Sequence, residues 1–595
     1  MAESYFLLAA TFIPLLLAPV AFVIGRRAGI TAVTWFSFGT LAVSTGLLAI
    51  PAILVQGGQV YSESYAWGQF GNFGLRLDGL ALPFALIIYI LCTVLALYSK
   101  PYMVHKIMED MPGHGSSSSS AAAASAGGHE GHGHAGGQVT LTVDQQKYVN
   151  HQMGLYFALY LAFSMGMLGT VLATNLIEFY VFFELMLVPS FFLVAFYGYG
   201  ARRRIALMFF FWTHVGAVVL LLSLLAMGFF AGGFDYSTVM ANVGKIPADW
   251  LPLIVFGLVV GLGVKLAAFL LHIWLPYAHA EAPTPVSALL SPAMIGIGAY
   301  GLLRLWLELL TGSYEQYSLY INMWGLATMM YGGAMALMQD DIKKVLAYSS
   351  ISQMGYILFG LGSESILGIS GATMLYITHG LGKAVLFMMA GSIILQTGTR
   401  SMSKLGGLAG KMPYTAVIAM IGALTIMGVP PTSGFMAEWT MFSGVLQTAS
   451  HDADSFRVVL FAFGILSTVL TSAYILWMIK RIFFGKVPEE LAHVKEASPY
   501  ITATMAAFAA LSLAIGVYPD VFFTPISDYV SGMFAGHEGI LPIPESSNTL
   551  ILEPVAHGAE GAATATATTT AAAGEGIAAD EGISAAEGTG GEGGH

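Results

Sequence analysis

Apolar residues recur along the chain in runs separated by short segments rich in Gly, Pro and charged residues. A run of about 20 residues matches the hydrocarbon core of a bilayer when it is helical. Backbone groups in lipid must pair within their own segment, and runs such as 206–230 lack the alternation of a membrane strand. The pattern predicts an all-α integral membrane protein with about fourteen transmembrane helices: 5–25, 30–54, 78–98, 152–172, 174–197, 204–230, 252–274, 287–310, 318–338, 343–362, 366–396, 413–447, 457–480 and 498–518.

One of these runs, 413–447, is too long for a single span. It contains Gly428-Val429-Pro430-Pro431, a combination that interrupts helices. We therefore expect a broken helix there. No strong internal repeat is visible, although paired broken helices would suit an inverted-repeat transporter.

The basic residues test the number of spans independently. With the N-terminus outside, seventeen of the 23 Lys and Arg fall in inner loops. The outer loops hold Arg76, Lys245 and Arg457, and the spans hold Lys265, Arg304 and Lys383. Such an excess of basic residues marks the cytoplasmic side of a membrane protein. Fourteen spans with both termini on the outer side are therefore predicted.

Composition supports the membrane interpretation. The 595 residues are 56% apolar and 10% charged, with a mean hydropathy of +0.73, whereas soluble domains carry about 25% charged residues. The single cysteine, Cys92, excludes disulfides within the chain and a thiolate metal cluster. The N-terminus lacks a basic segment before its apolar run, which predicts a first span and not a cleaved signal.

Two segments have low complexity. Residues 113–139 are rich in Ser, Ala, Gly and His, and residues 556–595 form a tail of Ala, Thr, Gly and Glu. Neither contains enough apolar surface to form a core, so both are predicted to be disordered. The 113–139 segment is expected to be a solvated linker. Weak metal binding by its four histidines is the alternative. The tail holds much of the net charge of −11.

Ionisable residues inside spans are the candidate functional residues. Each costs about 2.5 to 3.5 kcal/mol on insertion scales. The set comprises Glu178, Glu184, His214, Lys265, His272, Arg304, His379, Lys383 and Glu438. Arg304 lies near a span end, where we expect its side chain to reach towards the membrane surface.

Glu184 and Lys265 are the first candidate pair. Desolvation favours a neutral lysine, and a nearby carboxylate favours the charged form. A pair of variable separation is therefore a switchable proton site, and a static buried salt bridge is the alternative.

His379 and Lys383 are four residues apart and share a helix face. Histidine titrates near neutrality and can pass a proton between its two nitrogens, so these two predict a proton relay. His272 lies about two turns beyond Lys265, near the inner end, where a relay would meet water. Glu438 follows the helix break, and such breaks line sites in transporters. A hydrogen-bonded core histidine and a capping carboxylate are the structural alternatives.

At these residues the chain resembles the antiporter-like M subunit of respiratory complex I, which is related to Mrp-type antiporter subunits and to archaeal deazaflavin-dependent homologues. The matching stretches are 182–189 (FFELMLVP), 264–265 (VK), 272–279 (HIWLPYAH), 281–284 (EAPT), 341–350 (DIKKVLAYSS), 434–438 (GFMAE) and 480–485 (KRIFFG). The resemblance covers about 60–485 well. It implies an inverted-repeat antiporter-like fold.

The resemblance also implies a division of the chain. The expected parts are an N-terminal three-helix segment (1–112), a low-complexity loop (113–139), two antiporter-like helical repeats (140–310 and 311–485), a C-terminal helix region (486–555) and an acidic tail (556–595).

Proton translocation through buried Glu, Lys and His residues is the function that the resemblance implies. Glu184 and Lys265 correspond to the family's interacting pair, Glu438 to its terminal acid and His379 to a histidine of its central axis. The family usually has a lysine where this chain reads Gly296, and a histidine where it reads Gln353. Lys383 is the candidate for supplying the missing charge, and bound water is the alternative.

No dinucleotide, CxxC or haem motif occurs, so redox chemistry is assigned to partner subunits that carry flavin and iron–sulfur clusters. The expected partners are other membrane-arm and peripheral-arm subunits and lipid. Quinone is used by the complex but not bound here, and no nucleic acid is involved. The expected location is the cell inner (plasma) membrane. A Mrp-type sodium/proton antiporter subunit and a membrane-arm scaffold remain the alternatives.

Overall fold

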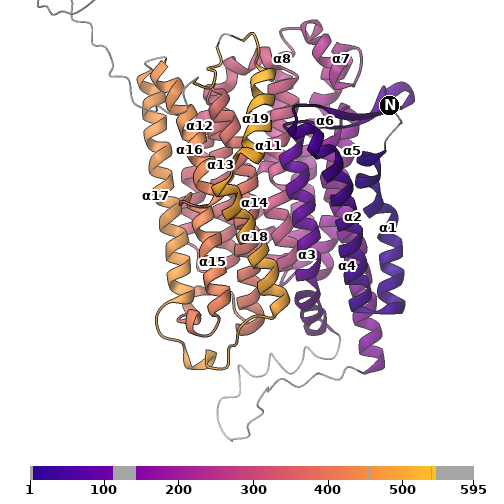
Figure 1. Cartoon of the computed structure of the whole chain (residues 1–595), viewed down its shortest axis with the longest axis vertical. Coiled ribbons are helices and arrows are strands. Elements are labelled where there is room, and N and C mark those ends of the chain that lie inside the picture. Colours follow the sequence, from indigo (N-terminus) through magenta and orange to yellow (C-terminus); the bar gives the residue numbers. More distant parts are fainter. Residues whose placement is uncertain (1–4, 112–141, 452–453, 538, 545–595) are drawn as a thin grey trace, which may run out of the picture. The chain divides into compact units, whose positions relative to one another are not determined.

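A computed structural model of the chain describes residues 5–111, 142–451, 454–537 and 539–544. The low-complexity segments 113–139 and 556–595 lie outside these residues. The compact unit ends at Ile543 and is a bundle of helices that run roughly antiparallel (Figure 1). Its first six helices are α1 (Phe6–Ala28), α2 (Ile30–Gln56), α3 (Ala81–Glu109), α4 (Val143–Leu172), α5 (Leu176–Tyr197) and α6 (Arg202–Ala231).

The rest of the bundle contains both long helices and short helical pieces. They are α7 (Tyr236–Ala241), α8 (Leu251–Leu266), α9 (Trp274–Glu281), α10 (Thr284–Leu289), α11 (Gly296–Gly301), α12 (Tyr314–Leu337), α13 (Ile342–Leu361), α14 (Ile366–Thr397), α15 (Pro413–Ile426), α16 (Ser433–His451), α17 (Ser455–Phe483), α18 (Pro499–Val517) and α19 (Asp520–Met533). Helices α10 and α11 belong to one continuous helical rod, Thr284–Glu308, which has π-helical turns at Leu290–Met294 and Leu302–Glu308.

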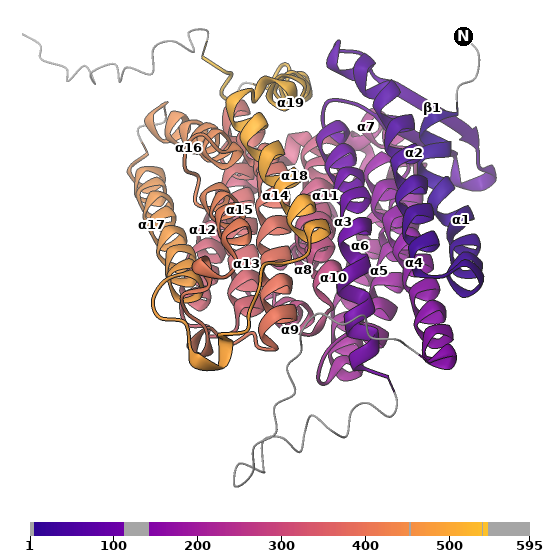
Figure 2. The same cartoon turned by 60° about the horizontal axis from the view of Figure 1, so that its bottom comes forward.

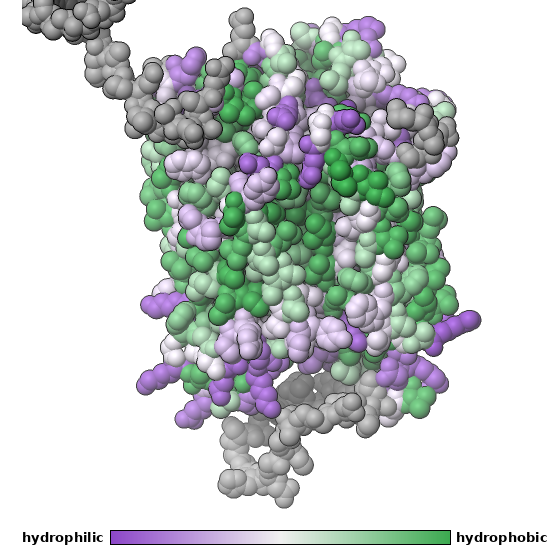
Figure 3. All heavy atoms as spheres, in the orientation of Figure 1, coloured by the Kyte–Doolittle hydropathy of each residue, from purple (hydrophilic) through white to green (hydrophobic). Residues whose placement is uncertain are grey.

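The outer surface of the bundle carries an apolar belt between two polar ends (Figure 3). Within the described residues, ten helices are long and apolar enough to cross a membrane. Four further units complete the bundle: α8 with α9, α12, α13, and α15 with α16. These units correspond one to one with the fourteen predicted spans, so the membrane fold class is confirmed.

Two of the units are broken near the middle of the bundle. Helix α15 ends at Ile426 and α16 begins at Ser433, which confirms the break predicted at Gly428–Pro431. The second break, between α8 and α9, was not predicted, because 252–274 was taken as one span. There Ala267 and Leu270 adopt positive φ angles of 58° and 74°, a region that residues other than Gly rarely occupy.

A small antiparallel sheet, which the all-α prediction did not include, lies at one end of the bundle. Strands β1 (Tyr61–Ala66) and β2 (Asn72–Leu77) pair from Tyr61 with Leu77 to Ala66 with Asn72. Helix α19 lies at the same end, and α9 lies towards the other (Figure 2). We call the first the hairpin end. The other, where α1 ends in Arg26 and Arg27 and α6 begins at Arg202, we call the basic end.

Candidate functional site

Glu184 and Lys265 lie on neighbouring parts of the bundle but make no direct contact. Helix α5 places Glu184 at its half-buried side, where Oε2 lies 3.0 Å from Nδ1 of His214 on α6. The other carboxylate oxygen, Oε1, has no hydrogen-bond partner among the described residues. The predicted pair is therefore within electrostatic reach but is not a static salt bridge in this conformation.

Lys265 occupies the last turn of α8, directly before the unpredicted break. Its side chain is buried, and within the described chain its Nζ has no hydrogen-bond partner. Nζ lies over the ring of Phe183, 4.6 Å from its centroid. A cation over an aromatic face gains about 0.5 to 2 kcal/mol. The ring is therefore a weak substitute for a carboxylate, and among the described residues no carboxylate is bonded to the ammonium.

Lys383 lies in the middle of α14 and is fully buried. Its Nζ donates to the carbonyl oxygen of Leu346 at 3.0 Å and to Oγ of Ser349 at 2.6 Å, both on α13. Ser349 in turn donates to the hydroxyl of Tyr474 on α17 at 2.9 Å. A continuous hydrogen-bonded path therefore leads from Lys383 across α13 to α17.

His379 lies one turn before Lys383 on the same face of α14, as predicted. Its ring is buried, and neither nitrogen has a hydrogen-bond partner in the described part of the chain. It lies within electrostatic reach of Lys383 and of His279 on α9. Buried polar atoms are normally paired, so these two bare nitrogens mark a site that water or a moving proton can use.

Sequence reasoning missed two buried residues beside this helix. His279 is fully buried, its ring stacks on Phe387 of α14 at 5.4 Å, and it lies within electrostatic reach of Lys343 and Lys383. Lys343, taken as a loop residue, is also buried and donates through Nζ to the carbonyl of Ala282. The available signal was the motif 272–279, which contains a second histidine.

Glu438 lies one turn into α16, just past the predicted break. Its carboxylate is buried and faces Gly428, which adopts a positive φ of 64°. A Cβ at that position would lie 2.4 Å from Oε2, so only glycine leaves the carboxylate room. Glu438 lies within electrostatic reach of Tyr356 and Tyr474, and Tyr474 ends the path from Lys383.

His272 lies in the irregular segment between α8 and α9. Its Nε2 is 3.1 Å from the hydroxyl of Tyr331 on α12, and its ring centroid lies 4.7 Å from that of Tyr331 and 6.2 Å from that of Phe269. The side chain is nearly buried. The structure thus gives this histidine one polar partner on a neighbouring helix, and its relay role stays a prediction.

The position of the absent lysine, Gly296 on α11, has no free space. A Cβ there would lie 2.1 Å from two ring atoms of Tyr376 on α14. The Tyr376 hydroxyl is buried and has no hydrogen-bond partner among the described residues. Gln353, which stands where a histidine was expected, donates to the carbonyl of Ile426 at the end of α15, 3.3 Å away.

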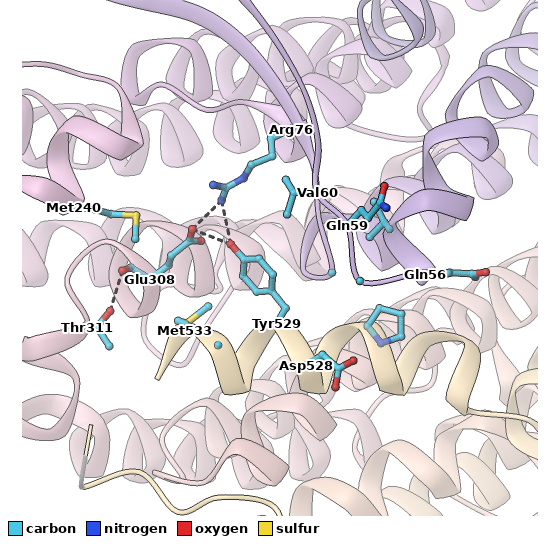
Figure 4. A pocket seen from close by; sticks show the side chains of 15 residues that line it. Gln56, Gln59, Val60, Arg76, Met240, Glu308, Thr311, Asp528, Tyr529 and Met533 are labelled. Atoms are coloured by element: carbon cyan, nitrogen blue, oxygen red, sulfur yellow. Dashed lines mark hydrogen bonds and ion pairs between the residues drawn. The ribbon is translucent and has the colours of Figure 1, made fainter. Parts of the chain in front are cut away.

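The expectation for Arg304 was wrong. Its side chain does not reach the surface: it is 1% exposed and pairs with Asp78 at 2.7 Å and Glu308 at 2.6 Å. Arg76 of β2 also pairs with both carboxylates, and Tyr529 of α19 bonds to both arginines and to Glu308. Figure 4 shows Arg76, Glu308 and Tyr529 converging beside a cavity of about 500 Å³.

Charge pairing fixes this hairpin-end network. Burial opposes ionisation of Asp78, but the guanidinium groups of Arg304 and Arg76 outweigh it and lower the pKa of Asp78. The carboxylate also accepts from the backbone N–H of Leu80 and Ala81. Such a network stabilises a structure and leaves little freedom for proton exchange.

The interior groups have the opposite character. Within the described residues, no three His, Cys, Asp or Glu side chains come together as metal ligands would. Lys265, His379 and Glu438 are separate and have no fixed charged partner in the part of the chain that the structure describes. Such an arrangement can take up and release protons, because each group's charge depends on partners that can move.

Comparisons with known proteins place these features in a wider group. Residues 173–471 match the family described as "NADH:quinone oxidoreductase/Mrp antiporter, TM". The chain is 32% identical over 406 residues to "NAD(P)H-quinone oxidoreductase chain 4 2" of Thermosynechococcus vestitus, covering 68% of this chain and 76% of the relative. It is 35% identical over 374 residues to "F(420)H(2) dehydrogenase subunit M" of Methanosarcina mazei, covering 61% and 74%.

The fold is similar to that of a chain in a solved multi-subunit complex. A chain of the Mrp complex from Dietzia sp. superposes with a TM-score of 0.74, covering 90% of this chain and 98% of that one. At 19% identity this likeness shows the fold alone. It confirms the antiporter-like arrangement of helices.

Proposed function

Because the chain belongs to the NADH:quinone oxidoreductase/Mrp antiporter membrane family, we propose that it moves protons across the membrane as a non-redox subunit of a quinone oxidoreductase of complex I type. Buried Glu, Lys and His side chains carry the protons, and partner subunits that hold flavin and iron–sulfur clusters supply the redox energy. No electron passes through this chain.

One observation carries the proposal. Glu184, Lys265, His379, Lys383 and Glu438 are all ionisable, Glu184 is half-buried and the other four are buried, and none is in a salt bridge with a fixed Lys, Arg, Asp or Glu of the described chain. Unpaired ionisable groups in a membrane are costly and are kept where protons or ions move. A scaffold would pair such charges, as the hairpin-end network does.

The lateral face around Glu184 indicates where a partner subunit binds. Glu184 is 19% exposed on a lateral face of α5 and α6 that is otherwise apolar, with Val181, Leu185 and Val215 at its surface. An ionisable pair facing lipid is unfavourable, so we assign this face to contact with a neighbouring membrane-arm subunit. Quinone reacts elsewhere in the complex.

The test is purification of the native complex, followed by pumping measurements in vesicles. Flavin and iron–sulfur subunits should copurify, and acidification driven by the electron donor should continue when sodium is replaced by potassium. Loss of transport without sodium, in a complex without redox subunits, would instead establish the Mrp-type antiporter.

The proposed orientation places both termini outside the cell inner (plasma) membrane. In right-side-out vesicles, added protease should trim the tail after about residue 556 and spare the 113–139 segment. Vesicles of the opposite orientation serve as the control, with the two results exchanged. Cleavage within 113–139 in right-side-out vesicles contradicts the orientation.

A further inference from the structure

His214 is a histidine within a membrane-spanning helix that the proposed relay does not use. It lies in α6, its ring stacks on Phe210 at 5.6 Å, and its side chain is 42% exposed on the lateral face. Among the described residues, its Nδ1 provides the one side-chain hydrogen bond of Glu184, at 3.0 Å. The carboxylate that is expected to serve Lys265 is therefore held by a different residue.

One oxygen of Glu184 and the amino nitrogen of Lys265 are both unpaired in the described chain. Glu184 Oε1 and Lys265 Nζ both lack hydrogen-bond partners among the described residues. The carboxylate nevertheless acts electrostatically on Lys265. One carboxylate is thus within reach of two groups that can be cations, and it is hydrogen-bonded only to His214.

Close helix packing places the two cations at the same level. Gly216 of α6 lies against Val264 of α8, where an added Cβ would come within 2.7 Å of the Val264 Cβ. His214 precedes Gly216 by two residues, and Lys265 directly follows Val264. His214 and Lys265 therefore lie at the same height in the bundle, while His214 points to a different side of α6, towards Glu184 of α5.

We propose that His214 is a positioning residue that competes with Lys265 for the Glu184 carboxylate, so that the charge on its imidazole decides which of the two Glu184 neutralises. A charged imidazole holds Glu184 at the lateral face, and a neutral one releases it towards Lys265 through a rotamer change. The proposal rests on the proposed function, because it assumes that Lys265 carries a proton in the transport cycle.

The charges account for the direction of the effect. When Glu184 turns to His214, the Lys265 ammonium contacts the Phe183 ring and has no counter-charge. The ammonium then loses its proton more readily. When Glu184 returns, the ammonium is favoured again. Histidine is the side chain that changes its charge near neutral pH.

The other titratable groups around α6 do not replace this pair. Helix α5 adds Tyr180, one turn from Glu184 and within its electrostatic reach. Helix α9 meets α6 through Trp274, which packs on Phe209 at 5.1 Å. The remaining titratable groups on packed elements lie towards the two ends of α6: Tyr197 of α5 and Tyr277, His279 and Glu281 of α9 at the basic end, and Glu178 of α5, Asp235, Tyr236 and Lys245 at the hairpin end.

Two variants with opposite charge test the competition in the assembled complex. His214→Arg carries a permanent cation that retains Glu184, so the alkaline limb of the pumping–pH profile should move about one pH unit lower. His214→Leu frees Glu184 for Lys265, and the same limb should move about one pH unit higher. Ala248→Arg adds a cation at an exposed loop position outside this face and should leave the limb unchanged.

A third variant guards against poor assembly of His214→Arg. His214→Gln keeps a hydrogen-bond donor for Glu184 but no charge, so its profile should move in the same direction as His214→Leu. Shifts of one sign in all variants, or a wild-type profile in His214→Gln, overturn the competition. Lys265→Ala is measured alongside: if it pumps normally, the proposed function itself fails.

Discussion

The hairpin-end network and the interior groups (Lys265, His379, Lys383 and Glu438) both consist of buried ionisable residues, in opposite arrangements. At the hairpin end, Arg304 meets Asp78 and Glu308 at 2.7 and 2.6 Å. In the interior, Lys265 has no hydrogen-bond partner in the described chain, and Lys383 has only a carbonyl and a hydroxyl. Burial alone therefore does not identify a proton site. The absence of a fixed counter-charge is the feature on which the proposed proton sites rest.

This difference has an energetic basis. Removing one member of a buried ion pair leaves an uncompensated charge and costs about 3 to 5 kcal/mol. A buried cation without a carboxylate partner has no such pair to lose, and its removal should change transport and not stability. The two regions should consequently respond to mutation in different measurements.

The largest expected effect is on stability, at the hairpin end. Arg304→Met should lower the free energy of unfolding by about 3 to 5 kcal/mol, measured as thermal stability of the purified complex. Arg76→Met, which removes the half-exposed member of the same network, should cost less. Pumping per assembled complex should stay normal in both, and a pumping defect with unchanged stability would erase the distinction drawn above.

The next effect is on transport, at Lys265. Lys265→Ala and Glu184→Gln should each lower proton pumping by about tenfold or more, equivalent to at least about 1.4 kcal/mol, with the complex assembled. Lys245→Ala removes an exposed lysine and is the matched control. Pumping close to wild type in either interior variant contradicts the assignment of that pair.

Lys383 tests whether the missing lysine has been replaced. Lys383→Met should lower pumping about fivefold, or about 1 kcal/mol. A lysine placed at Gly296 should restore part of it only when Tyr376 is also shortened to Ala, because the Tyr376 ring fills that space. Rescue by Gly296→Lys alone, or none in the triple variant when it is fully assembled, counts against the substitution.

The smallest expected effect is at Ser349, which links Lys383 to Tyr474. Ser349→Ala should slow pumping about twofold, because a net hydrogen bond contributes about 1 kcal/mol or less. Ser392→Ala removes a comparable buried hydroxyl from α14 and should have no effect. Equal rates in the two variants would mean that this path is not used.

The sequence predicted the membrane bundle well because hydrophobic length is a local property. Residues 366–396 were expected to be a span, and α14 runs from Ile366 to Thr397. The break at Gly428–Pro431 could be predicted because Gly and Pro interrupt helices. The break after Lys265 was not, because Ala267 and Leu270 carry no such signal and take positive φ angles only in the folded chain.

Contacts between distant residues could not be predicted. Arg304 stands at the end of an apolar run, which is compatible with a surface position, and its partner Asp78 lies 226 residues away. The same limitation applies to Gly296: the sequence shows that a lysine is absent, but not that Tyr376 occupies its place. The pairing of Glu184 with His214 spans 30 residues and two helices, so it also depended on the packing.

The hairpin-end network also has a consequence for how the chain is made. Asp78 enters the membrane early, whereas Arg304 is synthesised 226 residues later and Tyr529 another 225 residues after that. Until Arg304 is made, Arg76 is the only charged partner that the network offers Asp78. Ribosomes that stop before α19 would release a chain without the Tyr529 contacts, and membrane quality-control proteases could distinguish it from the finished product.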